Sequence, residues 1–166
     1  MDDITHLATV LGQQLQAIGA TVTTAESCTG GGIAEAITRV AGSSAWFEAG
    51  YVTYSNRQKH LQLQVPESLF DEVGAVSEAV VRAMALGARR QAQARFAVAV
   101  SGVAGPGGGS VDKPVGTVWL AWTDGEKIIA ERRQFDGDRQ AIRRQTVVTA
   151  LERLLELAAG EKPRQG

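Results

Sequence analysis

Residues 21–37 read TVTTAESCTGGGIAEAI, and this stretch decides the fold because it holds a predicted strand, a loop and a predicted helix in succession. Thr21 to Ala25 is a short run of apolar and β-branched residues, which is typical of a strand. Residues 30–39 carry apolar side chains at helical spacing, which predicts a helix. The loop between them has three successive side chains with a hydroxyl or a thiol, followed by glycines. It can be a catalytic turn, an anion-binding loop or only a tight bend.

The rest of the chain continues this alternation of helices and strands. Asp124-Gly125 is a hairpin signal between the last two predicted strands. Because helices alternate with strands early and a hairpin comes late, we expect an α/β protein with three layers, α/β/α, and a mixed, mostly parallel sheet. In such a sheet ligands gather at the carboxyl ends of the strands. Further helices are predicted at residues 4–18, from Ser55 onward, at 77–94 and at 138–157, and further strands at 50–54, 96–100, 115–123 and 127–134.

Composition limits the class of protein. The chain has 166 residues, 44% of them hydrophobic, so we expect one domain over residues 1–160 and a disordered tail at 161–166. The net charge of −1 gives no general attraction for nucleic acid. A single cysteine, an N-terminus unlike a secretory signal, and the lack of any apolar stretch of about 18 residues predict a cytoplasmic protein without a membrane segment.

The glycine-rich loop at residues 101–110, SGVAGPGGGS, does not fit the common nucleotide-binding motifs. The phosphate-loop pattern needs a lysine where Gly108 stands, and the dinucleotide pattern needs a glycine where Ser110 stands. His6 and His60 are far apart, with no Cys or carboxylate group at ligand spacing, so no metal site is expected. A Ser-His-Asp triad is equally unsupported, and a general base must be sought elsewhere.

Lys59 is the candidate base for Ser27. A neutral lysine can take the proton of a serine hydroxyl, which requires its pKa to fall from about 10.4 to about 7. Burial lowers a lysine pKa, and so does a helix N-terminus. Ser55 and Gln58 form a capping box, so a short helix should begin there and carry Lys59 in its first turns. Tyr54, at the end of the preceding predicted strand, can share a hydrogen-bond network with Lys59.

The same residues also have plainer interpretations. A lysine in a short helix usually carries a solvated charge, and a serine such as Ser27 often serves a turn or a cap. Cys28 is more often a small buried hydrophobe than a nucleophile. Glu26 can orient a neighbouring donor or simply favour the start of the helix. From spacing alone, acyl-transfer chemistry and an anion-binding loop both remain open.

Six segments of the chain together resemble the CinA C-terminal domain family. Any one of them is a weak signal, but six in this order, spread over nearly the whole chain, are specific. The matching segments are TAESCTGG at 24–31, GSSAWFEAGYVTYSN at 42–56 with Lys59 beyond it, GAVSE at 74–78, SGVAGPGGG at 101–109, KPVGTVW at 113–119 and GDRQAIRRQ at 137–145.

The stand-alone members of that family are nicotinamide-nucleotide amidases. The resemblance therefore implies hydrolysis of the carboxamide of nicotinamide mononucleotide to nicotinate mononucleotide and ammonia, in pyridine-nucleotide salvage, with no cofactor. It places the nucleophile on Ser27 and its assistants on Tyr54 and Lys59. Larger family members carry an additional N-terminal domain, whose activity is not implied for this chain.

Further binding roles follow from this assignment. Backbone N–H groups near Thr29, Gly30 and Gly31 are expected to stabilise the oxyanion. The substrate phosphate is expected to approach the glycine-rich loop, and among three candidate arginines, Arg139, Arg143 and Arg144, we favour Arg143 for a bidentate contact. The loop residues proposed for this contact are Ser101, Gly102, Gly105 and Gly107.

Three alternatives remain, together with one expectation about assembly. A non-catalytic nucleotide-binding module would bind the substrate and release no ammonia. A thiol amidase would use Cys28 instead of Ser27. An interaction domain could keep the fold without activity, although the intact set of Ser27, Tyr54 and Lys59 argues against it.

Trp46 and Phe47 look exposed in the sequence, and on that basis a homo-oligomer is expected.

Overall fold

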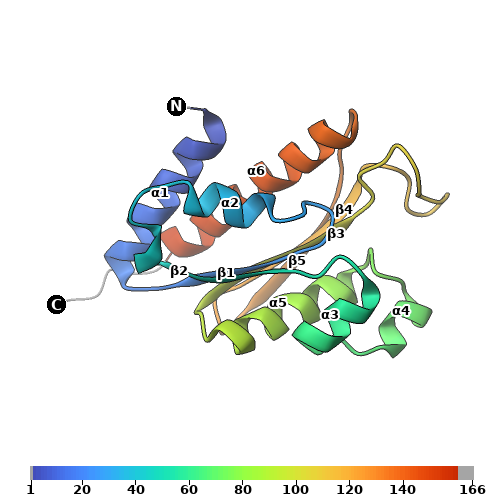
Figure 1. Ribbon diagram of the computed structural model, residues 1–166, viewed down its shortest axis with the longest axis horizontal. Helices are drawn as coiled ribbons and strands as arrows, with labels where there is room; N and C mark the ends of the chain where they lie inside the picture. Colours follow the sequence, from blue (N-terminus) through green and yellow to red (C-terminus); the bar gives the residue numbers. More distant parts are fainter. Residues whose placement is uncertain (1, 161–166) are drawn as a thin grey trace.

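A computed structural model describes residues 2–160 of the chain, and its centre is a five-stranded sheet with the order β2-β1-β3-β4-β5 (Figure 1). β1 pairs in parallel with β2 and β3, whereas β4 pairs antiparallel with β3 and β5. The sheet is mixed as expected, but the prediction of a mostly parallel sheet is wrong. The β4–β5 hairpin sets this balance, because β4 runs against both of its neighbours. The strands are β1 (Val22–Glu26), β2 (Phe47–Val52), β3 (Phe96–Gly102), β4 (Thr117–Thr123) and β5 (Ile128–Gln134).

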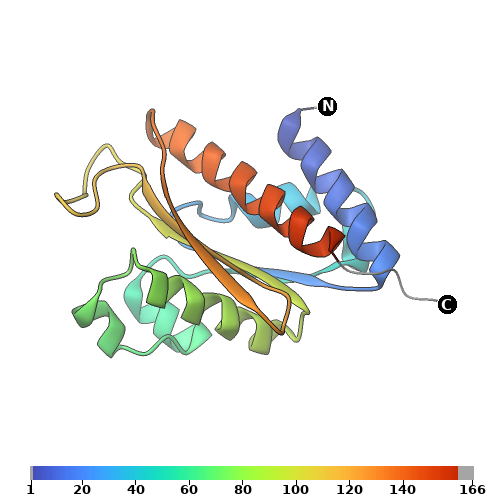
Figure 2. The same ribbon diagram turned by 180° about the vertical axis from the view of Figure 1, so that it is seen from behind.

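Helices cover both faces of the sheet, which confirms the three-layer α/β/α architecture (Figures 1 and 2). Each face has its own apolar cluster, one under α1, α2 and α6 and the other under α3 and α5. The first layer consists of α1 (Asp3–Ile18), α2 (Gly32–Thr38) and α6 (Arg139–Ala159), and the second of α3 (Asn56–Leu63), α4 (Ser68–Glu72) and α5 (Glu78–Ala92). A short 3-10 helix, η1 (Ser43–Ala45), precedes β2.

Local sequence signals explain where several helices begin. Ser55 accepts a hydrogen bond from the Gln58 N–H at 3.1 Å, so the predicted start of α3 is confirmed. Asp138 caps α6 and Ser77 caps α5 in the same way. The five-residue helix α4 was not predicted, because it is too short to show helical periodicity. The tail predicted at 161–166 lies outside the described residues.

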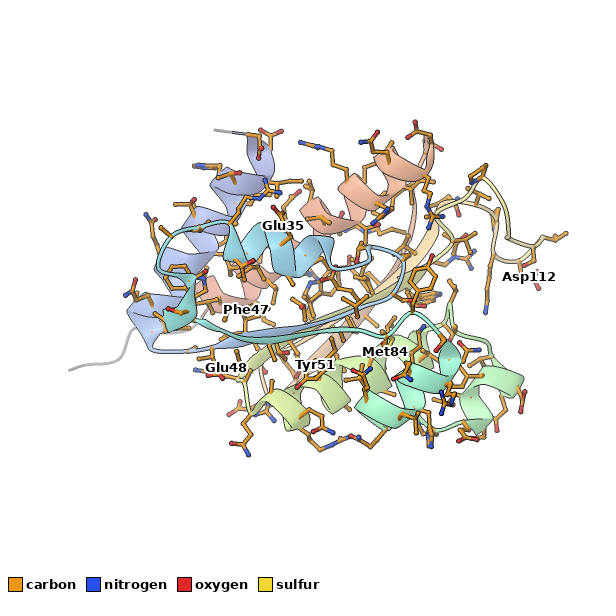
Figure 3. All side chains as sticks on the ribbon, viewed as in Figure 1. Glu35, Phe47, Glu48, Tyr51, Met84 and Asp112 are labelled. Carbon is orange, nitrogen blue, oxygen red and sulfur yellow. The ribbon has the colours of Figure 1, made fainter. Side chains whose placement is uncertain are left out.

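β2 begins at Phe47, three residues before the predicted strand, and contains a bulge. Val22 pairs with Phe47 and Thr23 with Ala49, so Glu48 is an extra residue on the β2 side. Phe47 therefore packs against the cluster under α1 and α2, while Tyr51 packs against the cluster under α5. In a regular strand two residues four apart share one face. Figure 3 labels these side chains along β2.

The expectation that Trp46 is exposed is wrong. Its side chain is only 5% exposed and belongs to the core cluster. Gly12 of α1 makes room for the indole, because a Cβ at this position would overlap the Trp46 ring. Trp46 and Phe47 therefore form no exposed patch, and a homo-oligomer remains a prediction without this support.

The loops after β1, β2 and β3 meet at one edge of the sheet. Past the end of β1, Ser27 N–H donates to Val100 O at 3.2 Å, and Thr53 N–H donates to Glu26 O at 2.9 Å. The end of β1 therefore lies between the ends of its two neighbours, as a parallel arrangement requires. No helix within residues 2–160 is long and apolar enough to span a membrane.

Replacing Gly87 by Ala should destabilise the protein. A Cβ at Gly87 of α5 would overlap the carbonyl oxygen of Leu63, the last residue of α3. We expect a net loss of about 2 kcal/mol, from overpacking of up to about 3 kcal/mol less the ~1 kcal/mol that Ala gains over Gly in a helix. Thermal unfolding measures it, with Gly107→Ala as the matched control because no atom lies within 4 Å of a Cβ there. Equal unfolding temperatures for the two variants would contradict this packing argument.

Candidate active site

Ser27 and Lys59 meet at the carboxyl edge of the sheet. Lys59 Nζ lies 3.0 Å from Ser27 Oγ, although the two residues come from different elements. Ser27 follows β1 directly, and Lys59 reaches it from the first turns of α3. The side chain of Lys59 is 1% exposed and Ser27 is 8% exposed, so bulk water does not surround the pair. The sequence-based pairing of these two residues agrees with this geometry.

Two backbone carbonyls hold the amine of Lys59. Its Nζ donates to Thr53 O and to Tyr54 O, each at 2.9 Å. A neutral amine has two N–H groups and one lone pair. When the two N–H groups bind the carbonyls, the lone pair is left for the hydroxyl proton of Ser27. The geometry therefore allows a serine nucleophile to pass its proton to a lysine base.

Burial shifts the protonation of Lys59 toward the neutral form. Loss of hydration lowers the pKa of Lys59 from 10.5 to about 8. No carboxylate oxygen is among the hydrogen-bond partners of Nζ in the described part of the chain, and carbonyl oxygens stabilise the cation less than an ion pair would. A substantial fraction of the amine is therefore neutral near pH 8 and can accept a proton.

Tyr54 contacts Lys59 through its backbone and not through its ring. Its side chain is 60% exposed, and its hydroxyl accepts a hydrogen bond from Arg139 Nη2 at 3.0 Å. Arg139 also donates to Gly105 O at 2.8 Å. Arg139 therefore ties the Tyr54 ring to the glycine-rich loop.

Cys28 points away from this chemistry. Its side chain is 5% exposed and belongs to the apolar cluster under α1, α2 and α6. Burial raises the pKa of the Cys28 thiol to about 11, so the reactive thiolate is scarce at neutral pH. These features favour the buried-hydrophobe interpretation of Cys28 over the thiol nucleophile.

The turn after Ser27 is held by Glu26, a contact that sequence reasoning raised only as one of two options. The Glu26 carboxylate accepts hydrogen bonds from the N–H groups of Ile33 at 2.8 Å and Ala34 at 3.0 Å, and from the Thr29 hydroxyl. The N–H of Gly30 donates to Ser27 O at 3.1 Å, so it is not free for an oxyanion. The N–H groups of Thr29 and Gly31, by contrast, bond no acceptor among residues 2–160.

A groove of about 1160 Å³ adjoins this turn on the α2 and α6 side. Thr29, Pro106, Arg139 and Arg143 are among the residues that line it. Arg143 Nη2 donates to Thr29 O at 3.1 Å, and the other N–H groups of this guanidinium are not engaged by residues 2–160. The groove therefore places a cationic side chain beside Thr29, whereas Ser27 and Lys59 are not among its lining residues.

The four residues of the glycine-rich loop that were predicted to bind the substrate lie in different environments. Figure 3 shows Asp112, two residues past this loop, projecting away from the body of the protein. A Cβ at Gly102 would lie 2.6 Å from Val118, and one at Gly105 would lie 2.5 Å from Val115, so both glycines serve close packing on the β4 side. Ser101, 2% exposed, stands beside the end of β1, whereas Gly107 is exposed and outside the groove lining.

The sequence profile of the CinA C-terminal domain matches residues 4–158, which is nearly the whole described chain. The chain belongs to the CinA C-terminal domain family. Its fold agrees, since it superposes on a solved competence-damaged protein (CinA) superfamily protein of Klebsiella pneumoniae with a TM-score of 0.92. The two are 40% identical, over 96% of this chain and 100% of the other.

Two proteins similar to this chain carry the same name, nicotinamide-nucleotide amidohydrolase PncC. The Pseudomonas putida protein is 72% identical over 157 residues, which cover 95% of this chain and 98% of that protein. The Escherichia coli K12 protein is 54% identical over 153 residues, which cover 92% and 93%. The similarity therefore extends over nearly the full length of both relatives.

Burial of Lys59 should make stability depend on pH in a defined window. The folded pKa of about 8 lies below the ordinary 10.5, so between these values the unfolded chain binds more protons and stability rises with pH. The cost of burying the charged amine should be absent above pH 10.5 and complete below pH 8, for a total of about 3 kcal/mol. Chemical denaturation of wild type and Lys59→Met at pH 7 to 10.5 measures the difference. Parallel pH profiles for the two proteins would show that Lys59 is not desolvated.

Proposed function

We propose that this protein hydrolyses the carboxamide of nicotinamide mononucleotide to nicotinate mononucleotide and ammonia, in pyridine-nucleotide salvage. The near full-length similarity to two nicotinamide-nucleotide amidohydrolases supports the reaction and the substrate. The observation that carries the mechanism is the 3.0 Å contact between Ser27 Oγ and the buried Lys59 Nζ. Ser27 is then the nucleophile and Lys59 the base.

Acylation uses the neutral form of Lys59. Ser27 Oγ attacks the carboxamide carbon while its proton passes to Lys59 Nζ. The carbonyl oxygen becomes an oxyanion, and the N–H groups of Thr29 and Gly31, which bond no acceptor among residues 2–160, are the donors proposed to receive it. Gly30, also expected at this position, is left out of the proposal because its N–H already binds Ser27 O. The C–N bond then breaks, Lys59 returns the proton to the leaving nitrogen, and ammonia departs.

Deacylation repeats these steps with water. A water molecule gives a proton to Lys59 as its oxygen attacks the ester carbon. The ester C–O bond then breaks, and Lys59 passes that proton to Ser27 Oγ. Tyr54 orients the amine through its backbone carbonyl, which accepts a hydrogen bond from Lys59. The hydroxyl of the Tyr54 ring is held by Arg139.

The phosphate of the substrate is assigned to the groove beside Thr29. Arg143 lines this groove and keeps N–H groups free after its bond to Thr29 O, within the part of the chain that the structure describes. Arg139 is less available, because it already bonds Gly105 O and the Tyr54 hydroxyl. The backbone of the glycine-rich loop, from Ser101 and Gly102 to Gly105 and Gly107, is proposed to approach the same substrate from the opposite side.

Ammonia release from nicotinamide mononucleotide tests the reaction and its nucleophile. We expect Ser27→Ala to lower kcat by at least about 1,000-fold, on the order seen when a serine nucleophile is removed. Cys28→Ala should retain most of the wild-type rate, because that side chain lies in the core and not against Lys59. Both variants are compared at equal folded concentration, judged by circular dichroism. Wild-type binding without ammonia release would favour a non-catalytic nucleotide-binding module, and loss of activity in Cys28→Ala alone would favour a thiol amidase.

Arg143→Gln tests the phosphate assignment. A charged hydrogen bond to phosphate contributes about 1.5–3 kcal/mol, so KM for nicotinamide mononucleotide should rise roughly 10- to 100-fold. The rate constant kcat/KM for nicotinamide riboside, which lacks the phosphate, should stay within about threefold of wild type. Steady-state ammonia release with both substrates makes the comparison. An equal loss on both would assign Arg143 to the turn and not to the phosphate.

A further inference from the structure

Glu26 is a fully buried carboxylate directly before the nucleophile. Its side chain is 0% exposed, and both of its oxygens are engaged. Burying a carboxylate is costly unless hydrogen bonds compensate, and here three donors do so. They are the Thr29 hydroxyl and the N–H groups of Ile33 and Ala34 in the first turn of α2. We call this set of four residues the Glu26 brace.

The brace closes the turn that carries the nucleophile. Glu26 is the last residue of β1, and Ile33 and Ala34 lie at the start of α2, so the carboxylate fixes both ends of residues 27–31. The Thr29 hydroxyl ties the middle of the turn to the same carboxylate. Gly30 N–H bonded to Ser27 O completes the turn from within. These bonds leave the N–H groups of Thr29 and Gly31 without an acceptor in the described chain, so both can receive a ligand oxygen.

The Glu26 brace also blocks anion binding at the N-terminus of α2. The N-terminus of a helix attracts anions through its free N–H groups. In α2 the groups of Ile33 and Ala34 already bind a carboxylate of the protein itself. A second negative charge at that end would meet Glu26, so the substrate phosphate is left to the arginine side of the groove.

We infer that Glu26 is a positioning residue for the reaction, acting through the Thr29 hydroxyl to hold the oxyanion donors of the turn in place. This inference rests on the proposed serine mechanism. Glu26 makes no hydrogen bond to Ser27 Oγ or Lys59 Nζ, whose hydrogen-bond partners within residues 2–160 are each other and the carbonyls of residues 53 and 54. Loss of the Glu26 brace should therefore lower the rate of the chemical step and leave the affinity for the substrate unchanged.

Thr29→Val and Thr29→Ser separate this role from simple packing. Valine keeps the branched shape and loses the hydroxyl, whereas serine keeps the hydroxyl and loses a methyl group. Displacement of a reacting group by about 1 Å can cost on the order of 100-fold, and we expect a fall of roughly 10- to 100-fold in kcat for Thr29→Val. The fall in log kcat for Thr29→Ser should be at most half of the fall in log kcat for Thr29→Val. KM for nicotinamide mononucleotide should change less than about threefold in both variants.

Binding is measured separately in a Ser27→Ala background, with and without the added Thr29→Val substitution. Calorimetry should give the two proteins the same Kd for nicotinamide mononucleotide, because the brace acts on the oxyanion that forms during the reaction and not on the bound substrate. Unchanged kcat in Thr29→Val, equal losses in Thr29→Val and Thr29→Ser, or a loss confined to Kd would each overturn the inference.

Labelling by a fluorophosphonate keeps this test independent of the substrate assignment. Ser27 Oγ forms the O–P bond, fluoride leaves, and Lys59 takes the proton, so the reaction needs the turn but not the nucleotide. Thr29→Val should slow labelling, and Thr29→Ser should recover it. If wild type is labelled yet releases no ammonia from nicotinamide mononucleotide, the proposed function fails and the labelling rates still decide the inference. If wild-type Ser27 is not labelled, the inference falls with the nucleophile.

Discussion

The buried amine of Lys59 is the constraint on which the rest of the site depends. With 1% of its side chain exposed, the amine must find all of its partners within the protein. It finds them in the carbonyls of Thr53 and Tyr54 and in the hydroxyl of Ser27. The two carbonyls are available because β2 ends at Val52, just before them. The end of a strand, which normally leaves backbone groups to water, here supplies the acceptors for a buried amine.

The same constraint explains how α3 is built. α3 has eight residues, and Lys59 and Leu63 are the two that it buries. The aliphatic stem of Lys59 therefore serves as a core side chain as well as a carrier of the amine. Leu63 packs directly over Gly87 of α5, so α3 can lie close enough for Lys59 to reach the sheet edge. The position of this amine therefore depends on packing between Leu63 and Gly87, neither of which contacts it through a polar group.

Sequence patterns predicted helices and strands well where a local signal marks them. They predicted side-chain burial and strand pairing poorly, because residues far apart in the sequence determine these. The capping residue Ser55 and the apolar strand at 96–100 are local signals, and both were confirmed. The burial of Trp46 depends on the space above Gly12, which is 34 positions away and leaves no local trace. The prediction of a mostly parallel sheet was wrong for a related reason. A hairpin signal shows that two strands are antiparallel to each other, but it does not show which other strand they pair with or in which direction. The contact of the Tyr54 ring with Arg139 was likewise beyond local patterns.

The choice among the reactive side chains of the turn follows from strand geometry. Successive side chains of a strand point to opposite faces, and this alternation continues past the end of β1. Ala25 faces the α5 layer, Glu26 faces α2, and Ser27 again faces the layer that contains Lys59. Cys28 then falls on the α2 side and enters the apolar core. Because the lysine comes from the opposite layer, the alternation that makes Ser27 its partner also buries the more nucleophilic thiol out of reach.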